Sequence, residues 1–253
     1  TVDALAEGAH FDRQFTDFKS LGWKALAVNI SDIAAMGGYP RLALLNLTLT
    51  KAISTDNVVD LCRGMRRCAD EFKTHVIGGN ISKAHNDFSV TVTLLGEVPP
   101  RQFLARSGAR VGDVIAVTGD LGAAHAGLKV LQSSLDKKLF PHSVRKHLTP
   151  MPRHRWLAQL LKSEIKIHSC IDLSDGLASD MHHVCEASGV GAELSRDQIP
   201  IHKETKKISE MMNEYALDYA LHGGEDYELA ITLPPTEFRK AKKLLKNNLT
   251  AVG

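Results

Sequence analysis

Segments with helical and with strand-like hydrophobic periods alternate irregularly along this chain, and a Pro99-Pro100 pair interrupts them. Residues 45–49 alternate apolar and polar side chains, as a half-buried strand does, whereas residues 20–36 repeat apolar side chains at the spacing of a helix. Because strands and helices are mixed without regular βαβ alternation, the pattern predicts an α+β protein. The proline pair is typical of a linker, so two domains are expected, residues 1–100 and residues 101–253.

Hydrophobic periodicity and turn residues predict the individual elements. Helices are expected over residues 20–36, 55–72, 122–131, 156–161, 178–188, 203–212 and 235–247, with Thr55 or Asp56 capping the second. Strands are expected over residues 45–49, 76–77, 88–94, 114–117, 165–173, 192–194 and 227–231. Residues 132–152 are polar and contain three prolines, so a linker-like segment with one short helix is predicted there.

Length and charge balance exclude several classes of protein. A chain of 253 residues is long enough to bury a core in each of two domains. Lys plus Arg number 31 and Asp plus Glu 29, so the formal charge of +2 does not indicate a nucleic-acid surface. No apolar run in the sequence approaches the ~18 residues of a membrane span. None of the four cysteines forms a C-x-x-C pair, so a zinc ribbon or thioredoxin motif is not expected and the thiols are expected to be reduced and buried. The sequence shows no basic-then-apolar secretory signal, so a cytoplasmic protein is expected.

Two carboxylates, Asp172 and Asp175, stand three residues apart in the segment 171–176, which reads IDLSDG. A predicted strand delivers both acids into a turn that contains a glycine. Carboxylate oxygens beside the Ser174 hydroxyl suit a magnesium ion that keeps part of its water shell. The alternative is structural, since Ser174 or Asp175 could instead cap the helix that is predicted to follow.

Three further positions could bind a ligand or could be purely structural. Asp32 falls near the apolar stripe of its predicted helix, where a carboxylate needs a cation, an arginine or backbone donors unless it lies at a solvated edge. Gly78-Gly79 follow a predicted strand, and their amides could form an anion-binding nest or simply a turn. His10, next to Phe11, could be a ligand or a core histidine.

Residues 223–228 read GGEDYE and place three acids within four residues before a predicted strand. These acids could bind a cation or a cationic group, or they could form a solvated turn. The sequence contains no P-loop, no G-x-G-x-x-G segment and no recognisable Ser-His-Asp or Cys-His arrangement. Carboxylates and glycine turns without a nucleophile favour metal-assisted phosphoryl transfer, in which positioning and charge neutralisation provide most of the catalysis.

These segments, in this order, resemble the thiamine-monophosphate kinase family over nearly the whole chain. The resemblance rests on TVD at 1–3 with EGAHF at 7–11, KALAVNISDIAAMG at 24–37, IGG at 77–79, RSGA at 106–109 with GD at 112–113, IDLSDG at 171–176 and GGEDYEL at 223–229. The last run is the most specific. The others occur in weaker form in aminoimidazole-ribonucleotide synthetase and selenophosphate synthetase.

The resemblance implies direct phosphoryl transfer from ATP to thiamine monophosphate, with several magnesium ions and no covalent nucleophile. It also implies an N-terminal mixed-sheet domain that forms a homodimer by packing strands, a C-terminal α/β sandwich, and ATP in a cleft between the domains. The implied magnesium ligands are Thr1, Val2, Asp3, Asp32, Asn80, Asp172 and Asp175. The residues implied to face ATP are Gly79, Asn80, Arg106 and Ser174, and those implied to face the thiamine phosphate are His10 and Glu225.

Two departures from the family pattern matter for function. The family has Asp where this chain has Asn80, so one negative charge is lost although an amide oxygen remains. The family also has an acid-rich motif before the first segment and strands after the last, so truncation at both outer ends is expected. The alternative functions are a nucleotide-binding relative without catalytic activity, and another synthetase of the superfamily with a different substrate.

Three placements are predicted from these motifs. Asp172 and Asp175 are expected close to Asp32, because acids without basic partners need a shared cation. Arg106 is expected to point into the cleft between the domains. The Gly78-Gly79 turn is expected to present its amides to phosphate and to place the following side chain beside magnesium.

Overall fold

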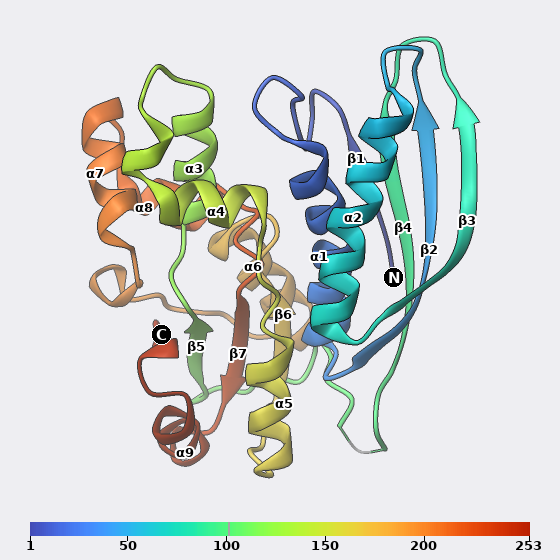
Figure 1. Ribbon diagram of the computed structural model, residues 1–253. Helices are drawn as coiled ribbons and strands as arrows, with labels where there is room; N and C mark the ends of the chain where they lie inside the picture. Colours follow the sequence, from blue (N-terminus) through green and yellow to red (C-terminus); the bar gives the residue numbers. More distant parts are fainter. Residues whose placement is uncertain (101) are drawn as a thin grey trace. The chain divides into compact units, whose positions relative to one another are not determined.

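The computed structural model describes residues 1–100 and 102–253, and it divides into two compact units (Figure 1). Unit 1 comprises Thr1–Ile33 and Tyr39–Glu97, and unit 2 comprises Ala34–Gly38 and Val98–Gly253. Each unit has its own sheet and its own hydrophobic core. The mixture of helices and antiparallel and parallel strands agrees with the predicted α+β class.

Unit 1 is a four-stranded mixed sheet with two helices on one face (Figure 1). Its elements are β1 (Val2–Ala6), α1 (Phe18–Ala35), β2 (Tyr39–Leu49), α2 (Thr55–Phe72), β3 (His75–Lys83) and β4 (Ser89–Glu97). The strand order is β1-β4-β2-β3, with β4 antiparallel to both of its neighbours and β3 parallel to β2. Alternate residues of β4, from Val90 to Leu94, are buried in the core that α1 and α2 complete, as their period predicts.

The N-cap of α2 is Ser54, so the expected cap at Thr55 or Asp56 is wrong. The Ser54 hydroxyl accepts a hydrogen bond from the Asn57 amide at 3.2 Å, and the Asn57 side chain accepts one from the Ser54 amide at 3.0 Å. Ser54 is selected because this reciprocal pair satisfies two amides that the helix start leaves without partners.

The predicted turn at Gly78-Gly79 is also wrong, because both glycines lie inside the continuous strand β3. A β-bulge just before Gly78 shifts the pairing with β2. A Cβ on Gly79 would lie 1.8 Å from the carbonyl oxygen of Leu45, so the close approach of the two strands requires glycine there. The two glycines therefore accommodate strand pairing and do not open a phosphate-binding turn.

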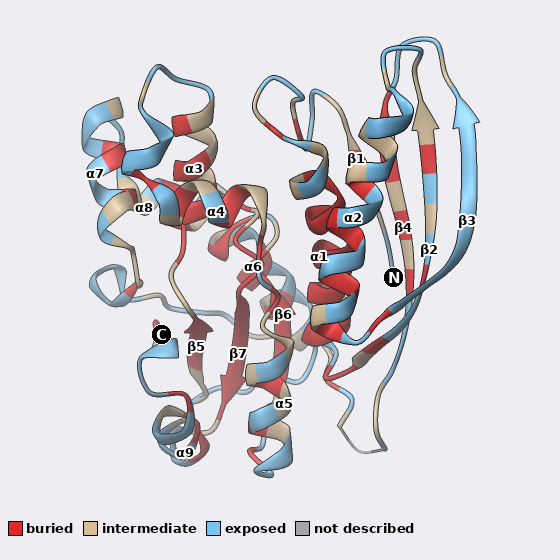
Figure 2. Ribbon diagram, in the orientation of Figure 1, coloured by how far each residue is buried: buried red, intermediate tan, exposed pale blue. Residues whose placement is uncertain are grey.

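Unit 2 contains a four-stranded antiparallel sheet with helices packed against both faces (Figure 1). Its strands are β5 (Val114–Thr118), β6 (Ser169–Asp172), β7 (Leu229–Leu233) and β8 (Leu249–Ala251), in the order β6-β7-β5-β8. Because β5 and β6 both run antiparallel to β7, the C-terminal ends of β5 and β6 and the N-terminal end of β7 lie at the same end of the sheet. Figure 2 shows these three strands buried, whereas β3 of unit 1 is exposed along its length.

The helices of unit 2 form three groups of contacts. They are α3 (Ala123–Leu131), α4 (Pro141–Leu148), α5 (His154–Lys162), α6 (Leu177–Ser188), α7 (Lys203–Met212), α8 (Ala216–His222) and α9 (Pro235–Leu245), with 3-10 turns at Lys137–Leu139, Arg196–Gln198 and Lys246–Asn248. α5 and α9 pack on one face of the sheet, and α6 and α8 pack on the other. α3, α7 and α8 enclose Phe140 in a separate small core.

The sequence predictions differ from the structure at several places in unit 2. Residues 132–152 contain the predicted short helix, α4, but they are not linker-like, because α4 buries Ser143, Lys146 and His147, and Phe140 beside it is buried too. No strand forms over residues 192–194, β6 begins only at Ser169, and α8 was not expected. Polar side chains on a buried helix face hide the helical hydrophobic period that identifies such a helix.

Candidate functional site

Two loops of unit 2, the one that follows β6 and the one that precedes β7, are held together by backbone hydrogen bonds. The Glu225 amide donates to the Ser174 carbonyl at 2.8 Å, and the Tyr227 amide donates to the Leu173 carbonyl at 2.9 Å. The Leu173 amide in turn donates to the Glu228 carbonyl at 2.8 Å. This short ladder brings the predicted residue Glu225 next to Ser174, from which about fifty positions separate it in the sequence.

The loop after β6 does not cap α6 with a side chain, so the capping interpretation of Ser174 and Asp175 is wrong. Gly176 occupies the N-cap with a φ of 105°, and no side chain caps the helix there. The exposed Asp175 instead donates its backbone amide to the Asp180 carboxylate at 3.2 Å. Asp172 is buried at the end of β6. The loop therefore presents a serine and an acid that the helix start does not use.

Asp180 is an acid of this loop that sequence analysis missed. Burial raises its pKa to about 6, and the nearby charge of Asp175 adds to the rise. Its position in the first turn of α6, five residues after Asp175, was the signal that could have identified it.

The loop before β7 has an unusual backbone. Glu225 and Tyr227 adopt left-handed φ values of 60° and 49°, which non-glycine residues rarely do. A Cβ on Gly224 would lie 2.5 Å from the Ser174 carbonyl oxygen, so the contact between the two loops requires glycine at this position. Backbone strain of this kind is held by its surroundings and often occurs at functional sites.

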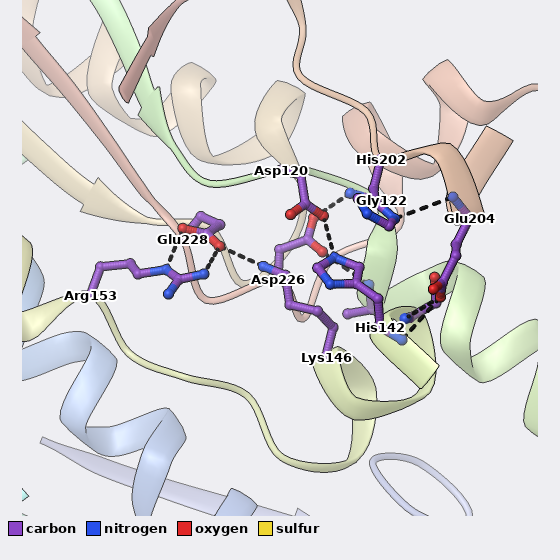
Figure 3. Close-up of polar contacts among 11 residues, drawn as sticks. Asp120, Gly122, His142, Lys146, Arg153, His202, Glu204, Asp226 and Glu228 are labelled. Atoms are coloured by element: carbon purple, nitrogen blue, oxygen red, sulfur yellow. Dashed lines mark hydrogen bonds and ion pairs between the residues drawn. The ribbon is translucent and has the colours of Figure 1, made fainter. Parts of the chain in front are cut away.

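Two of the three acids in this loop are buried, so a solvated acidic turn is excluded. Glu228 is completely buried, and its carboxylate accepts a hydrogen bond from the Thr118 hydroxyl at 2.6 Å. It also accepts hydrogen bonds from Lys146 at 2.5 Å and from Nε and Nη2 of Arg153 (Figure 3). Burial alone would raise the pKa of Glu228, but the Lys146 and Arg153 cations outweigh burial and hold it below its ordinary value. Glu228 is the centre of a structural ion-pair cluster.

Asp226 has a different structural role, at the start of α3. Its carboxylate accepts hydrogen bonds from the amides of Gly122 at 2.6 Å and Ala124 at 3.1 Å, so it caps a helix that follows a left-handed glycine (Figure 3). Burial raises the pKa of Asp226 to about 6, although Lys146 and the two amides act in the opposite direction. Sequence analysis did not separate these two acids from Glu225, because all three share one short acidic run.

A polar network that sequence analysis also missed links α4 and α7 to the loop after β5. His142 lies 3.0 Å from the Asp120 carboxylate, and its ring stacks on the His202 ring at 3.9 Å (Figure 3). The Glu204 carboxylate accepts from the amides of His142 and Ser143 at 3.0 Å each, and so caps α4. Burial would raise the pKa of Asp120, but the His142 hydrogen bond and the Lys146 cation lower it below the ordinary value.

Glu225 is the partly accessible acid of the loop. Its side chain is 24% exposed, and its Oε2 lies 3.2 Å from Nδ1 of His147, which is buried in α4. The structure therefore separates three neighbouring acids into a helix cap, an ion-pair centre and one carboxylate that solvent or a ligand can reach.

In unit 1, two predicted acids lie against each other. The Asp3 carboxyl on β1 lies beside the Asp32 carboxyl on α1, and the Thr1 hydroxyl donates to Asp32. Burial raises the pKa of Asp3 to about 6, the Asp32 charge adds to the rise, and the amino-terminal ammonium opposes it by less. Two carboxylates and a hydroxyl that share one place are a donor set that fits a hard divalent cation. A solvated helix edge for Asp32 is excluded by this contact.

Other predicted residues of unit 1 lie apart from this acid pair. Asn80 is exposed on β3 opposite Asn46, and β3 is the edge strand farthest from β1. Two strands intervene, so Asn80 and Asp3 of one chain are on the order of 14 Å apart across the sheet. Gly79, on the same edge strand, is exposed.

The remaining predicted residues are accessible. Val2 is exposed on β1, and His10 is exposed in the loop before α1, where its Nδ1 accepts from the Ala6 amide at 3.2 Å. His10 is therefore not a core histidine. Arg106 is exposed in unit 2, in the segment before β5, and its carbonyl accepts from the Ser188 hydroxyl at 3.4 Å.

Within residues 1–100 and 102–253, no group of three or more His, Cys, Asp or Glu side chains is arranged to hold a metal ion. Across the same residues, no helix combines the length and apolar character that a membrane crossing needs.

Comparison with known proteins matches both halves of the chain to one family. Residues 1–98 match "AIR synthase related protein, N-terminal domain", and residues 110–252 match "AIR synthase related protein, C-terminal domain". Thiamine-monophosphate kinase of Aquifex aeolicus is 36% identical over 236 residues, covering 92% of this chain and 75% of that protein. The Bacillus subtilis thiamine-monophosphate kinase is 35% identical over 249 residues, covering 96% and 74%. A solved structure of AaThiL complexed with AMPPCP and TMP superposes with a TM-score of 0.91 at 34% identity, covering 100% of this chain and 79% of that one.

Proposed function

This chain belongs to the thiamine-monophosphate kinase family of AIR synthase related proteins, and we propose that it phosphorylates thiamine monophosphate with ATP. The products are thiamine diphosphate and ADP. The observation that carries this function is the 36% identity to a thiamine-monophosphate kinase over 92% of the chain. The superposition on a structure that holds AMPPCP and TMP supports the same pair of substrates.

The reaction needs positioning more than it needs acid-base chemistry. A phosphate oxygen of thiamine monophosphate forms a bond to the γ-phosphorus of ATP, and the bond between that phosphorus and the β,γ-bridging oxygen breaks, leaving ADP. The acceptor oxygen is already anionic near neutral pH, so no side chain has to remove a proton from it. This fits loops that present Ser174, Asp175 and Glu225 without an activated nucleophile.

Magnesium fits the acids of both units. In unit 1 the Asp3 and Asp32 carboxylates and the Thr1 hydroxyl would hold it, with the Val2 backbone beside them, since two adjoining acids are relieved by a cation. In unit 2, Asp172 and Asp175 would hold it at the end of β6. Bound magnesium would neutralise phosphate charge.

The substrate contacts are assigned by position in the family motifs. Arg106 is exposed, and its guanidinium could hold two phosphate oxygens of ATP at once. Ser174, Gly79 and Asn80 are the other residues assigned to ATP. Glu225 is assigned to thiamine monophosphate, whose thiazolium ring carries a positive charge that a carboxylate would offset, and His10 is assigned to the same substrate.

A homodimer that forms through the unit 1 sheet is part of this proposal. The face of the sheet opposite α1 and α2 exposes large apolar residues, and strand register places Val2, Leu44 and their neighbours Leu42 and Leu95 on that one face. An exposed apolar sheet face of this kind usually lies in an interface. Leu44→Arg should convert the dimer to a monomer in size-exclusion chromatography with light scattering, whereas an unchanged mass would exclude this face.

The decisive experiment is a coupled ADP-release assay with ATP, magnesium and thiamine monophosphate, with thiamine diphosphate identified by mass spectrometry. ADP release should depend on thiamine monophosphate, and thiamine without its phosphate should not replace it. Nucleotide binding without turnover would instead support a non-catalytic relative. ADP release with a different acceptor would support another synthetase activity.

A further inference from the structure

Helix α4 contacts the 223–228 loop through two adjacent buried residues, Lys146 and His147. Lys146 Nζ lies 2.5 Å from Glu228 Oε1, at the end of the loop that enters β7. His147 Nδ1 lies 3.2 Å from Glu225 Oε2, nearer the start of the loop. The same turn of α4 therefore holds the loop at two points.

The Lys146 contact cannot be released without a large cost. Glu228 is completely buried and is also held by Arg153, which follows α4 in the chain and donates from Nε at 2.6 Å. Removing one partner of such a cluster leaves an uncompensated charge in the interior. A Cβ on Gly119 would lie 2.2 Å from Glu228 Oε1, so the carboxylate has no room to move in that direction. The ion-pair cluster thus fixes the spacing between α4 and the loop.

The loop is also supported from behind. A Cβ on Gly223 would lie 2.4 Å from the Tyr219 carbonyl oxygen and 2.6 Å from the Cβ of His125, so α8 and α3 leave no free space there. With this support, Glu225 keeps its left-handed backbone at φ 60°. The His147 imidazole lies beside the Glu225 side chain and constrains the direction of its carboxylate.

We propose that His147 is a positioning residue that orients the Glu225 carboxylate toward the cationic ring of thiamine monophosphate. The Lys146–Glu228–Arg153 cluster fixes the helix and the loop, and the His147 ring, whose Nδ1 lies 3.2 Å from Glu225 Oε2, restricts the orientation of the carboxylate. This inference rests on the proposed function, in which Glu225 faces that substrate. It adds a buried residue of α4, a helix without any of the motif segments, to substrate recognition.

The test compares His147→Leu, which removes the polar ring nitrogen that lies 3.2 Å from Glu225 Oε2, with His147→Asn, whose amide nitrogen takes nearly the place of Nδ1. His168→Leu is the matched control, because His168 forms the same kind of pair with Asp113, at 2.9 Å. That pair lies at the other end of the same sheet, where β5 and β6 begin. The KM for thiamine monophosphate, the KM for ATP and kcat are measured for each variant, with thermal unfolding as a check on folding.

His147→Leu should raise the KM for thiamine monophosphate about tenfold, the scale of one polar contact with a charged group, and leave the KM for ATP and kcat within about twofold. His147→Asn should restore most of the loss, and His168→Leu should change neither KM. Inhibition by an analogue with a neutral ring in place of thiazolium should be weakened less than binding of the cationic substrate. A double-mutant cycle of His147→Ala, which also removes the ring nitrogen, with Glu225→Gln provides the coupling if His147→Leu does not fold.

The outcomes separate this inference from the proposed function. A wild-type protein without ADP release in the presence of thiamine monophosphate overturns both. An active wild type with an unchanged KM in His147→Leu, or additive effects in the cycle, overturns only the role of His147. A parallel loss in both KM values and kcat, without recovery in His147→Asn, shows a general packing role and also overturns it.

Discussion

Asp3 and Asp32 in unit 1 and Glu228 in unit 2 are acids that are partly or wholly buried. The charged neighbour of Asp3 is another carboxylate, whereas those of Glu228 are cations. Asp3 lies against another carboxylate, which together with burial raises its pKa to about 6. Glu228 lies between Lys146 and Arg153, which hold its pKa below the ordinary value in spite of complete burial. The same type of side chain is therefore compensated within the fold in one unit and left in need of a cation in the other.

This difference separates structural acids from ligand-binding acids. A carboxylate with its own cations stabilises the fold and has little left to offer a ligand. Two carboxylates in contact repel each other, so the fold is less stable until a cation arrives, and the binding energy of that cation is gained at a defined place. Asp226 lies between these cases, because the Lys146 cation and the helix amides offset its burial only in part.

The largest expected effect tests the compensated cluster. Glu228→Gln leaves the buried Lys146 and Arg153 without a carboxylate, so the free energy of unfolding should fall by about 3–5 kcal/mol. Urea-induced unfolding measures the change. The control is Asp70→Asn, which breaks the exposed Arg66–Asp70 pair and should cost less than ~0.5 kcal/mol. Equal losses in the two variants would remove the distinction between the cluster and a surface ion pair.

The opposite sign is expected for the uncompensated pair. Asp32→Asn removes the repulsion on Asp3. In magnesium-free buffer at pH 7.5 the free energy of unfolding should therefore rise by about 1 kcal/mol after allowance for partial exposure. The same variant should lose phosphoryl transfer at least about a hundredfold, and magnesium should stabilise it less than it stabilises the wild type. The control Asp60→Asn should leave the activity unchanged, since Asp60 pairs with Arg63 on the surface. A loss of stability in Asp32→Asn would contradict a metal-binding role for this pair.

Asp226 should produce a pH dependence with the sign of an unfavourably buried acid. Its folded pKa of about 6 lies above the unfolded value of 3.8, so its contribution is most favourable below pH 4 and is lost as the pH rises through 6. Asp226→Asn should remove roughly 2 kcal/mol of that decline. Unfolding measured from pH 4 to pH 7 gives the difference between the two proteins, in which the similar slopes from Asp3 and Asp180 cancel. A flat difference curve would show that the helix amides compensate Asp226 fully.

The smallest effect concerns Asn80, which tests whether β3 belongs to the metal site. Asn80→Asp should shift the magnesium activation curve to lower concentration by about threefold, because a carboxylate is the better magnesium ligand. Asn46→Asp is the matched control, since Asn46 is the register partner of Asn80 on β2. ADP release against magnesium concentration measures both. Superimposable curves for Asn80→Asp and wild type would show that residue 80 does not touch the metal.

Hydrophobic period predicted the elements whose buried faces are apolar. The helices at 20–36, 55–72 and 178–188 and the strands at 88–94 and 114–117 are all present, with ends that differ by a few residues. The failures share a cause. α4 buries Lys146 and His147 against the acids of a distant loop, and Gly78-Gly79 are needed by the approach of a neighbouring strand, so neither pattern has a local explanation.

The sequence alone also identified where the candidate site would be, but not what each acid does. The IDLSDG and GGEDYE segments were singled out, and the structure joins them by hydrogen bonds across β6 and β7. Which of Glu225, Asp226 and Glu228 remains accessible depends on α3 and α4. Asn80 and Asp3, grouped by motif, lie on opposite edge strands of the unit 1 sheet.

The order of apolar and polar residues determined the fold class, the main helices and strands, and the family of this protein, because these depend on local periods and on short runs of consecutive residues. Only the tertiary structure decided that Glu228 is neutralised by Lys146 and Arg153, that Asp3 faces Asp32, and that His147 lies against Glu225. The charge state and use of a carboxylate depend on its burial and on the charges within a few ångströms of it, and in this protein those neighbours come from residues about 30 to 80 positions away in the chain.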